Sequence, residues 1–93
     1  MATANVGVTP VLLAPSNAGR RTFSIRNTSA GVQKVSLDNT LPDGLTTTNA
    51  GYLLVPGEAL HFILAFDGKE IKQPRSAVSD IAGATVLWKE LSE

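Results

Sequence analysis

Apolar and polar residues alternate with a period of two along most of this 93-residue chain. The run ALHFILAF at 59–66 places four large apolar residues on one face of an extended chain, namely Leu60, Phe62, Leu64 and Phe66. Three further runs alternate in the same way: TFSIRN at 22–27, QKVSLD at 33–38 and ATVLWKEL at 84–91. Because a period of two is typical of a strand with one buried face, each run predicts a strand.

These registers also predict which side chains face a core. The inward residues of the three further runs are Phe23, Ile25, Val35, Leu37, Ala84, Val86 and Trp88. Ser36 lies between two of them and is predicted to face water. Trp88 is the single tryptophan of the chain, and its register makes it a core residue.

Turn residues separate the strands. PGE at 56–58 lies between YLLV and ALHFILAF, and the pattern predicts a hairpin, because Pro presets φ and Gly accepts a positive φ. SAG at 29–31 predicts a similar connection between TFSIRN and the strand that follows. DG at 67–68 is a dipeptide typical of tight hairpin turns.

The remaining segments predict no long helix, because apolar residues do not recur at helical spacing. DNTLPDGLTTTNAG at 38–51 predicts a surface loop. PRSAVSDIAG at 74–83 predicts one short helical turn, capped by Ser79 or Asp80. We therefore expect an all-β fold, a single small antiparallel β-sandwich or barrel of about six to eight short strands.

The first twelve residues differ from the rest. They are uncharged, and Pro10 cannot donate to a central ladder. We expect residues 1–12 to form an extended N-terminal arm or an edge strand that attaches to another chain. Residues 13–93 then form a single β-domain.

Composition narrows the class of protein. Hydrophobic residues make up 43% of the chain and charged residues 17%, which fits a globular domain. Eight basic residues balance eight acidic ones, so we expect neither nucleic acid nor a membrane as partner. The absence of cysteine excludes disulfides and thiolate ligands. No basic residue precedes Arg20, so the pattern of a secretory signal is missing.

Candidate catalytic and metal-binding residues are few. His61 is the only histidine, and its possible partners are Asp67, Ser79 and Asp80. A zinc site needs three or four ligands, and DNTLPDG at 38–44 lacks the spaced acidic ligands of a calcium loop. We therefore expect a structural histidine, no metal, no cofactor and no enzymatic activity.

Two groups of basic residues and one aromatic residue are candidates for binding. Arg20 and Arg21 cluster before the first alternating run, and Lys69, Lys72 and Arg75 follow the last residue of ALHFILAF. Each group is either a solvated face or a contact for an acidic partner. A carbohydrate site would use Tyr52 and the loop at 46–49.

The order of these features resembles a recurring small β-domain of tailed bacteriophages. In that family an Arg-x-x-Phe/Leu-x-Ile-x-Asn strand precedes a Gly-x-x-Leu-x-Pro-Gly-Glu hairpin and a last strand rich in Thr and Val. The matching positions here are Arg20 or Arg21, Phe23, Ile25, Asn27, Gly51, Leu54, Pro56, Gly57 and Glu58. The resemblance covers residues 20–90.

The resemblance implies a virion structural protein, either a capsid decoration (cement) protein or a head or tail accessory. Such a protein is made in the host cytoplasm, resides on the capsid surface, binds the major capsid protein or another virion protein, and forms homo-oligomers. We expect the arm to add a strand to a neighbouring chain and the basic groups to set the register. The predicted partner-binding residues are Val6, Val8, Val11, Arg20, Arg21, Lys69, Lys72 and Arg75. The alternative is a tail or fibre module that binds a receptor or glycan.

Overall fold

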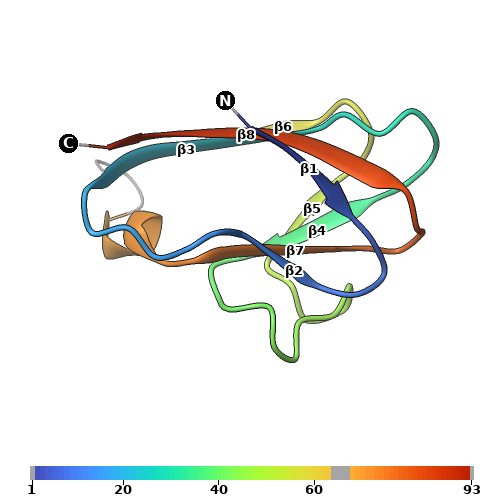
Figure 1. Cartoon of the computed structure of the whole chain (residues 1–93), viewed down its shortest axis with the longest axis horizontal. Helices are drawn as coiled ribbons and strands as arrows, with labels where there is room; N and C mark the ends of the chain where they lie inside the picture. Colours follow the sequence, from blue (N-terminus) through green and yellow to red (C-terminus); the bar gives the residue numbers. More distant parts are fainter. Residues whose placement is uncertain (1, 64–67, 93) are drawn as a thin grey trace.

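The computed structural model describes residues 2–63 and 68–92, and these residues form two sheets that pack face to face (Figure 1). The strands are β1 (Ala2–Val6), β2 (Val11–Ala14), β3 (Arg20–Asn27), β4 (Val35–Asp38), β5 (Tyr52–Leu54), β6 (Ala59–Ile63), β7 (Arg75–Ser79) and β8 (Ala84–Ser92). A short 3₁₀ helix, η1 (Gly68–Lys72), precedes β7. The all-β prediction is confirmed. No helix in these two ranges has the length and apolar character needed to cross a membrane.

The strands pair in a nested order. Sheet A has the order β1-β8-β3-β6, and sheet B has the order β2-β7-β4-β5. Strand β1 pairs with β8, β2 with β7, β3 with β6 and β4 with β5, all antiparallel. The chain is thus one long antiparallel hairpin, with its tip at residues 39–51, that wraps into two sheets. An eight-stranded double sheet of this kind is a jelly roll.

The core lies between the sheets and follows the predicted alternation. Phe23, Ile25, Val35, Leu37 and Val86 are at most 1% exposed. The Phe23 ring stacks on the half-buried Trp88 ring, with 5.7 Å between the ring centroids. Phe62 and Leu60 also face this core, whereas Leu64 and Phe66 lie outside the described residues. The period of two therefore gave the correct inward face of β3, β4, β6 and β8.

The hairpins predicted at 56–58 and 29–31 are wrong, and the turn predicted at 67–68 includes Asp67, which lies outside the described residues. Strand β5 belongs to sheet B and β6 to sheet A, so the turn at 56–58 crosses between sheets instead of joining neighbours. The turn itself is as predicted, since Gly57 has a φ of 89° and the Glu58 amide donates to the Val55 carbonyl at 3.0 Å. The connection at 29–31 likewise leads from β3 in sheet A to β4 in sheet B.

The predicted helical turn at 74–83 is also wrong, because residues 75–79 form strand β7 in the middle of sheet B. All five residues of β7 are buried. The outer face of β7 is covered by the loop at 39–51, which places Leu45 (5% exposed) in one hollow with Val78 (3%). Ser36 lies opposite Val78 and is buried there, contrary to its predicted exposure.

The N-terminal residues complete both sheets. Strand β1 is an edge of sheet A, β2 is an edge of sheet B, and the Ser79 amide donates to the Gly7 carbonyl between them at 2.8 Å. Of the two predicted forms, arm or edge strand, residues 2–12 take the second. Val6 is 1% exposed and belongs to the core.

Candidate functional site

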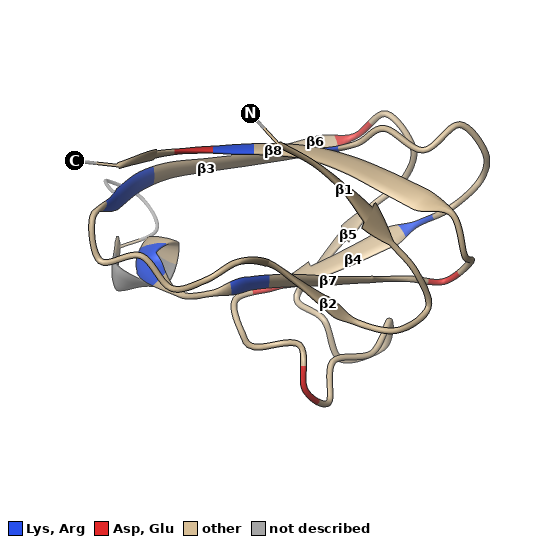
Figure 2. Cartoon of the chain, viewed as in Figure 1, with Lys and Arg blue, Asp and Glu red and all other residues tan. Residues whose placement is uncertain are grey.

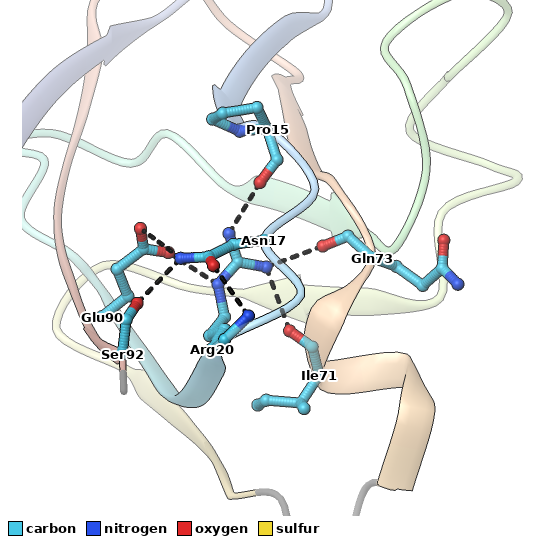
Figure 3. Close-up of polar contacts among 8 residues, drawn as sticks. Pro15, Asn17, Arg20, Ile71, Gln73, Glu90 and Ser92 are labelled. Atoms are coloured by element: carbon cyan, nitrogen blue, oxygen red, sulfur yellow. Dashed lines mark hydrogen bonds and ion pairs between the residues drawn. The ribbon is translucent and has the colours of Figure 1, made fainter.

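Arg20 is the first residue of β3, and its guanidinium lies among polar groups from several segments (Figure 3). Its side chain is fully buried, and Nε donates to Glu90 Oε2 at 2.6 Å. Its terminal nitrogens donate to three carbonyl oxygens, those of Pro15 at 2.8 Å, Ile71 at 3.0 Å and Gln73 at 2.7 Å. One guanidinium thus ties the start of β3 to β8, to η1 and to the segment after β2. A planar group with several fixed donors suits such a role.

A second buried arginine lies close by. The Arg75 guanidinium is 4.4 Å from the Phe62 ring centroid and 5.4 Å from that of Phe23, and it donates to Asn39 Oδ1. The Arg20 guanidinium is also 5.4 Å from the Phe23 centroid. Cations at these distances from ring faces are attracted by the ring quadrupole. Both arginines therefore stabilise the core.

Three predicted partner-binding residues are corrected by this arrangement. Arg20 and Arg75 are fully buried and Val6 is almost so, so none of them presents its side chain to a partner. The sequence pattern did not predict the burial of these arginines, because an arginine is expected at the surface unless its hydrogen-bond acceptors inside the protein are known. Of the remaining predicted residues, Val8 and Arg21 are exposed, Val11 and Lys72 are half-buried, and the side chain of Lys69 lies outside the described part.

Asn27 clamps the opposite end of β3. Its side chain is fully buried, and Nδ2 donates to the Gln33 and Leu54 carbonyls, both at 2.9 Å. Its backbone bonds the sheet-crossing turn twice, since its amide donates to the Glu58 carbonyl and its carbonyl accepts from the Gly57 amide. Asn27, Leu54, Gly57 and Glu58 thus meet at one structural junction.

His61 lies on the outer face of sheet A. It is exposed, and Nδ1 is hydrogen-bonded to the hydroxyl of Ser24, its cross-strand neighbour. Two of its predicted partners, Ser79 and Asp80, lie at the end of β7 in the other sheet, and Asp67 is outside the described residues. Among the described residues no group of three histidine, aspartate or glutamate side chains is placed to hold a metal ion.

A shallow hollow of about 260 Å³ lies on the same outer face, between β3, β6 and β8. Arg26 and Lys89 line it together with Ser24, Ala59 and Leu87. The register places Lys89 opposite Ser24 and Leu87 opposite Arg26, so the two cations are diagonal neighbours. Neither forms an ion pair with a described residue.

Three exposed apolar side chains lie before β2, in β2 and in the long loop, namely Val8, Leu12 and Leu41, together with the half-buried Pro10 and Pro42. We define the loop surface as Val8, Pro10, Leu12, Leu41 and Pro42. Leu12 and Leu41 line one hollow, and Pro10, Leu41 and Pro42 line the next. Val8 lines a third with Leu45. In Figure 1 the loop lies below β7 and β2, away from sheet A.

Sequence reasoning found only Val8 of this surface. Leu12 is one of two adjacent leucines in VLLA, and Leu41 is a single leucine in a polar loop, so the sequence pattern does not show which of these side chains is exposed. Within the loop, Leu45 takes the buried position over Val78 and Leu41 is exposed.

The predicted carbohydrate residues do not form an exposed aromatic platform. Tyr52 is half-buried and packs edge-on against Phe62, with centroids 5.2 Å apart. Thr46 and Asn49 bond one another within the loop, through the Thr46 amide and Asn49 Oδ1 at 2.7 Å. Stacking on a sugar ring needs an accessible aromatic face, so this arrangement does not favour the carbohydrate hypothesis.

Comparisons of the chain with protein-family models, with curated proteins and with solved structures found no match.

Proposed function

We propose that this chain is a non-enzymatic structural protein of a virion that decorates the assembled capsid. Its motif residues resemble those of a tailed-phage β-domain, and jelly rolls occur among viral capsid proteins and lectins. One fold serves many functions, so the proposal depends mainly on the loop surface and not on the fold.

The observation that carries the proposal is the exposure of apolar side chains on the loop surface. Val8 is 62% exposed, Leu41 58% and Leu12 42%. Apolar side chains that gather on one surface are typical of protein contacts. Full burial of a leucine is worth roughly 1.5–3 kcal/mol, so a partner that covers these residues gains binding free energy from each.

The loop is held in shape before it binds. Leu45 anchors it over sheet B, Asn49 Nδ2 donates to the Gly44 carbonyl at 2.9 Å, and Ser76 Oγ donates to the Thr40 carbonyl at 2.6 Å. A loop ordered in advance loses less conformational entropy on binding. Leu41 is therefore presented at a small entropic cost.

The proposed partner is the major capsid protein or another virion protein. A capsid repeats the same site many times, so a modest affinity at each site supports high occupancy when neighbouring copies also contact one another. The contact uses the loop surface instead of the free arm expected from the sequence, because β1 and β2 are paired within the domain.

Gold labelling of purified virions from the source lysate, with an antibody to this chain, tests the proposal. Regular label over the heads is the expected result. Label confined to tails would replace decoration by an accessory role, and particles without label would overturn the virion proposal altogether.

A further inference from the structure

The four edge strands of the sandwich differ in how well they are protected against pairing with another chain. Strand β2 has a register shift between Leu12 and Ala14 and is flanked by Pro10 and Pro15. Strand β5 has only three residues and is followed by Val55 and Pro56. Bulges, prolines and short length are the usual devices that block edge-to-edge pairing.

Strand β1 has none of these devices. It is five residues long, pairs with β8 without a register shift, and contains no proline and no charge. Figure 2 shows β1 without a charged residue along its whole length. Its outer edge carries backbone groups that another strand can pair with. Strand β6, the other edge of sheet A, continues into residues 64–67, outside the described part.

We propose that β1 pairs antiparallel with β1 of a second copy of this chain, which joins two A sheets into one sheet of eight strands. The sequence of β1 is compatible with pairing to the same strand of a second copy. Across a twofold axis each side chain near the axis meets the same surface of the other copy, so a charge there would repel itself. The residues Ala-Thr-Ala-Asn-Val contain no charge and no side chain larger than valine.

One register overlaps all five residues. Residues directly opposite in an antiparallel pair share a face of the sheet, so a twofold axis at Ala4 places Thr3 opposite Asn5 and Ala2 opposite Val6. This register keeps the exposed residues Thr3 and Asn5 on the outer face. The half-buried alanines then extend the core side of each sheet.

The pairing is weak in free solution. Stable interfaces bury at least about 1,000 Å², and five paired residues bury less. The dimer therefore forms at high protein concentration. The loop surface uses other residues, so failure of this pairing and failure of capsid binding are separate results.

Cysteine cross-linking tests the register, since the natural chain has no cysteine. Purified Thr3→Cys and Asn5→Cys proteins are oxidised separately and as a mixture. The mixture should give a disulfide-linked heterodimer about tenfold faster than either protein alone forms a homodimer, because only the mixed pair places both sulfurs opposite each other. Thr47→Cys, in the exposed loop, mixed with Thr3→Cys is the control. Equal rates in all mixtures would overturn the register.

Sedimentation equilibrium of the unmodified protein tests the pairing itself. We expect a monomer–dimer equilibrium that Thr3→Lys/Asn5→Lys abolishes, because lysines then face lysines across the axis. Ala30→Lys/Val32→Lys adds the same charge at exposed positions and should leave the dimer intact. A monomer at every concentration, or equal loss in both variants, would overturn the proposal.

Discussion

Arg20 and Arg21 are adjacent in sequence and have opposite environments. The first is fully buried with four hydrogen-bond acceptors around it, and the second is exposed. The ladder between β3 and β8 shifts register at this point, between Arg20 and Thr22. The side chain that points inward thus finds acceptors from η1, from the segment after β2 and from Glu90.

Replacement of Arg20 should therefore be severe, while replacement of Arg21 should not. Arg20→Leu leaves the Glu90 carboxylate and three carbonyls without their donor, and we expect a loss of about 3–5 kcal/mol in the free energy of unfolding. Arg21→Leu, at an exposed position, should change it by less than about 0.5 kcal/mol. Urea denaturation of both variants measures this difference. Equal midpoints would show that the buried network contributes nothing to stability.

For single residues, the sequence predicts the burial of apolar side chains well and the burial of polar side chains poorly. Phe23, Ile25 and Val86 are buried as the alternation indicates. Arg20, Asn27 and Arg75 are equally buried, but their burial depends on acceptors that lie up to 70 residues away in the chain. No local pattern contains that information.

Among the elements, the long loop at 39–51 has two roles: it packs against β7, and it forms part of the loop surface. Leu45 is 5% exposed beside Val78, and Leu41 in the same loop is 58% exposed. The loop therefore covers the outer face of β7 with one leucine and presents the other to solvent. This explains why β7 is buried on both faces.

The two leucines should respond differently to truncation. Leu45→Ala leaves a cavity over Val78, and we expect a loss of about 2–4 kcal/mol in the free energy of unfolding. Leu41→Ala removes an exposed side chain and should change it by less than about 0.5 kcal/mol. Thermal or urea unfolding distinguishes them. If both variants unfold like the natural protein, the loop does not cover β7 in solution.

Turn chemistry predicted where the chain reverses but not the sheet it enters next. Gly57 takes the positive φ that the sequence indicates, yet β6 pairs with β3 instead of β5. A Pro-Gly turn fits both a hairpin and a sheet crossing, and long-range pairing decides between them. Likewise, Arg75–Ser79 lacks strict alternation because both of its faces are buried. Without that alternation the sequence did not predict this central strand.

The whole molecule depends on its N-terminal residues because of the nested topology. Strands β1 and β2 are the outer partners of β8 and β7, and Val6 is part of the core. The sequence identified residues 1–12 as unusual, but it could not reveal that they lie on both sheets. That arrangement requires knowledge of the last strand, which is more than 70 residues away.

Deletion of residues 2–12 should therefore unfold the domain instead of releasing an arm. The truncated chain loses all of β1, half of β2 and the buried Val6 side chain. We expect loss of dispersed amide signals in NMR spectra and of cooperative unfolding. Addition of a peptide comprising residues 1–14 should restore both. A truncated chain that folds alone would contradict the nested sandwich.

The most direct test of capsid decoration through the loop surface is rebinding of purified protein to virions that lack this chain. Leu41→Asp changes the loop surface, while Leu53→Asp changes a leucine of nearly equal exposure on β5, 56% against 58%. We predict that Leu41→Asp lowers capsid occupancy by about tenfold or more. The aspartate carboxylate would have to lose its water at the contact, and the apolar packing of the leucine would be lost. Leu53→Asp should bind like the natural protein. Equal binding of all three proteins would contradict the loop surface as the contact, and no binding by the natural protein would contradict capsid decoration itself.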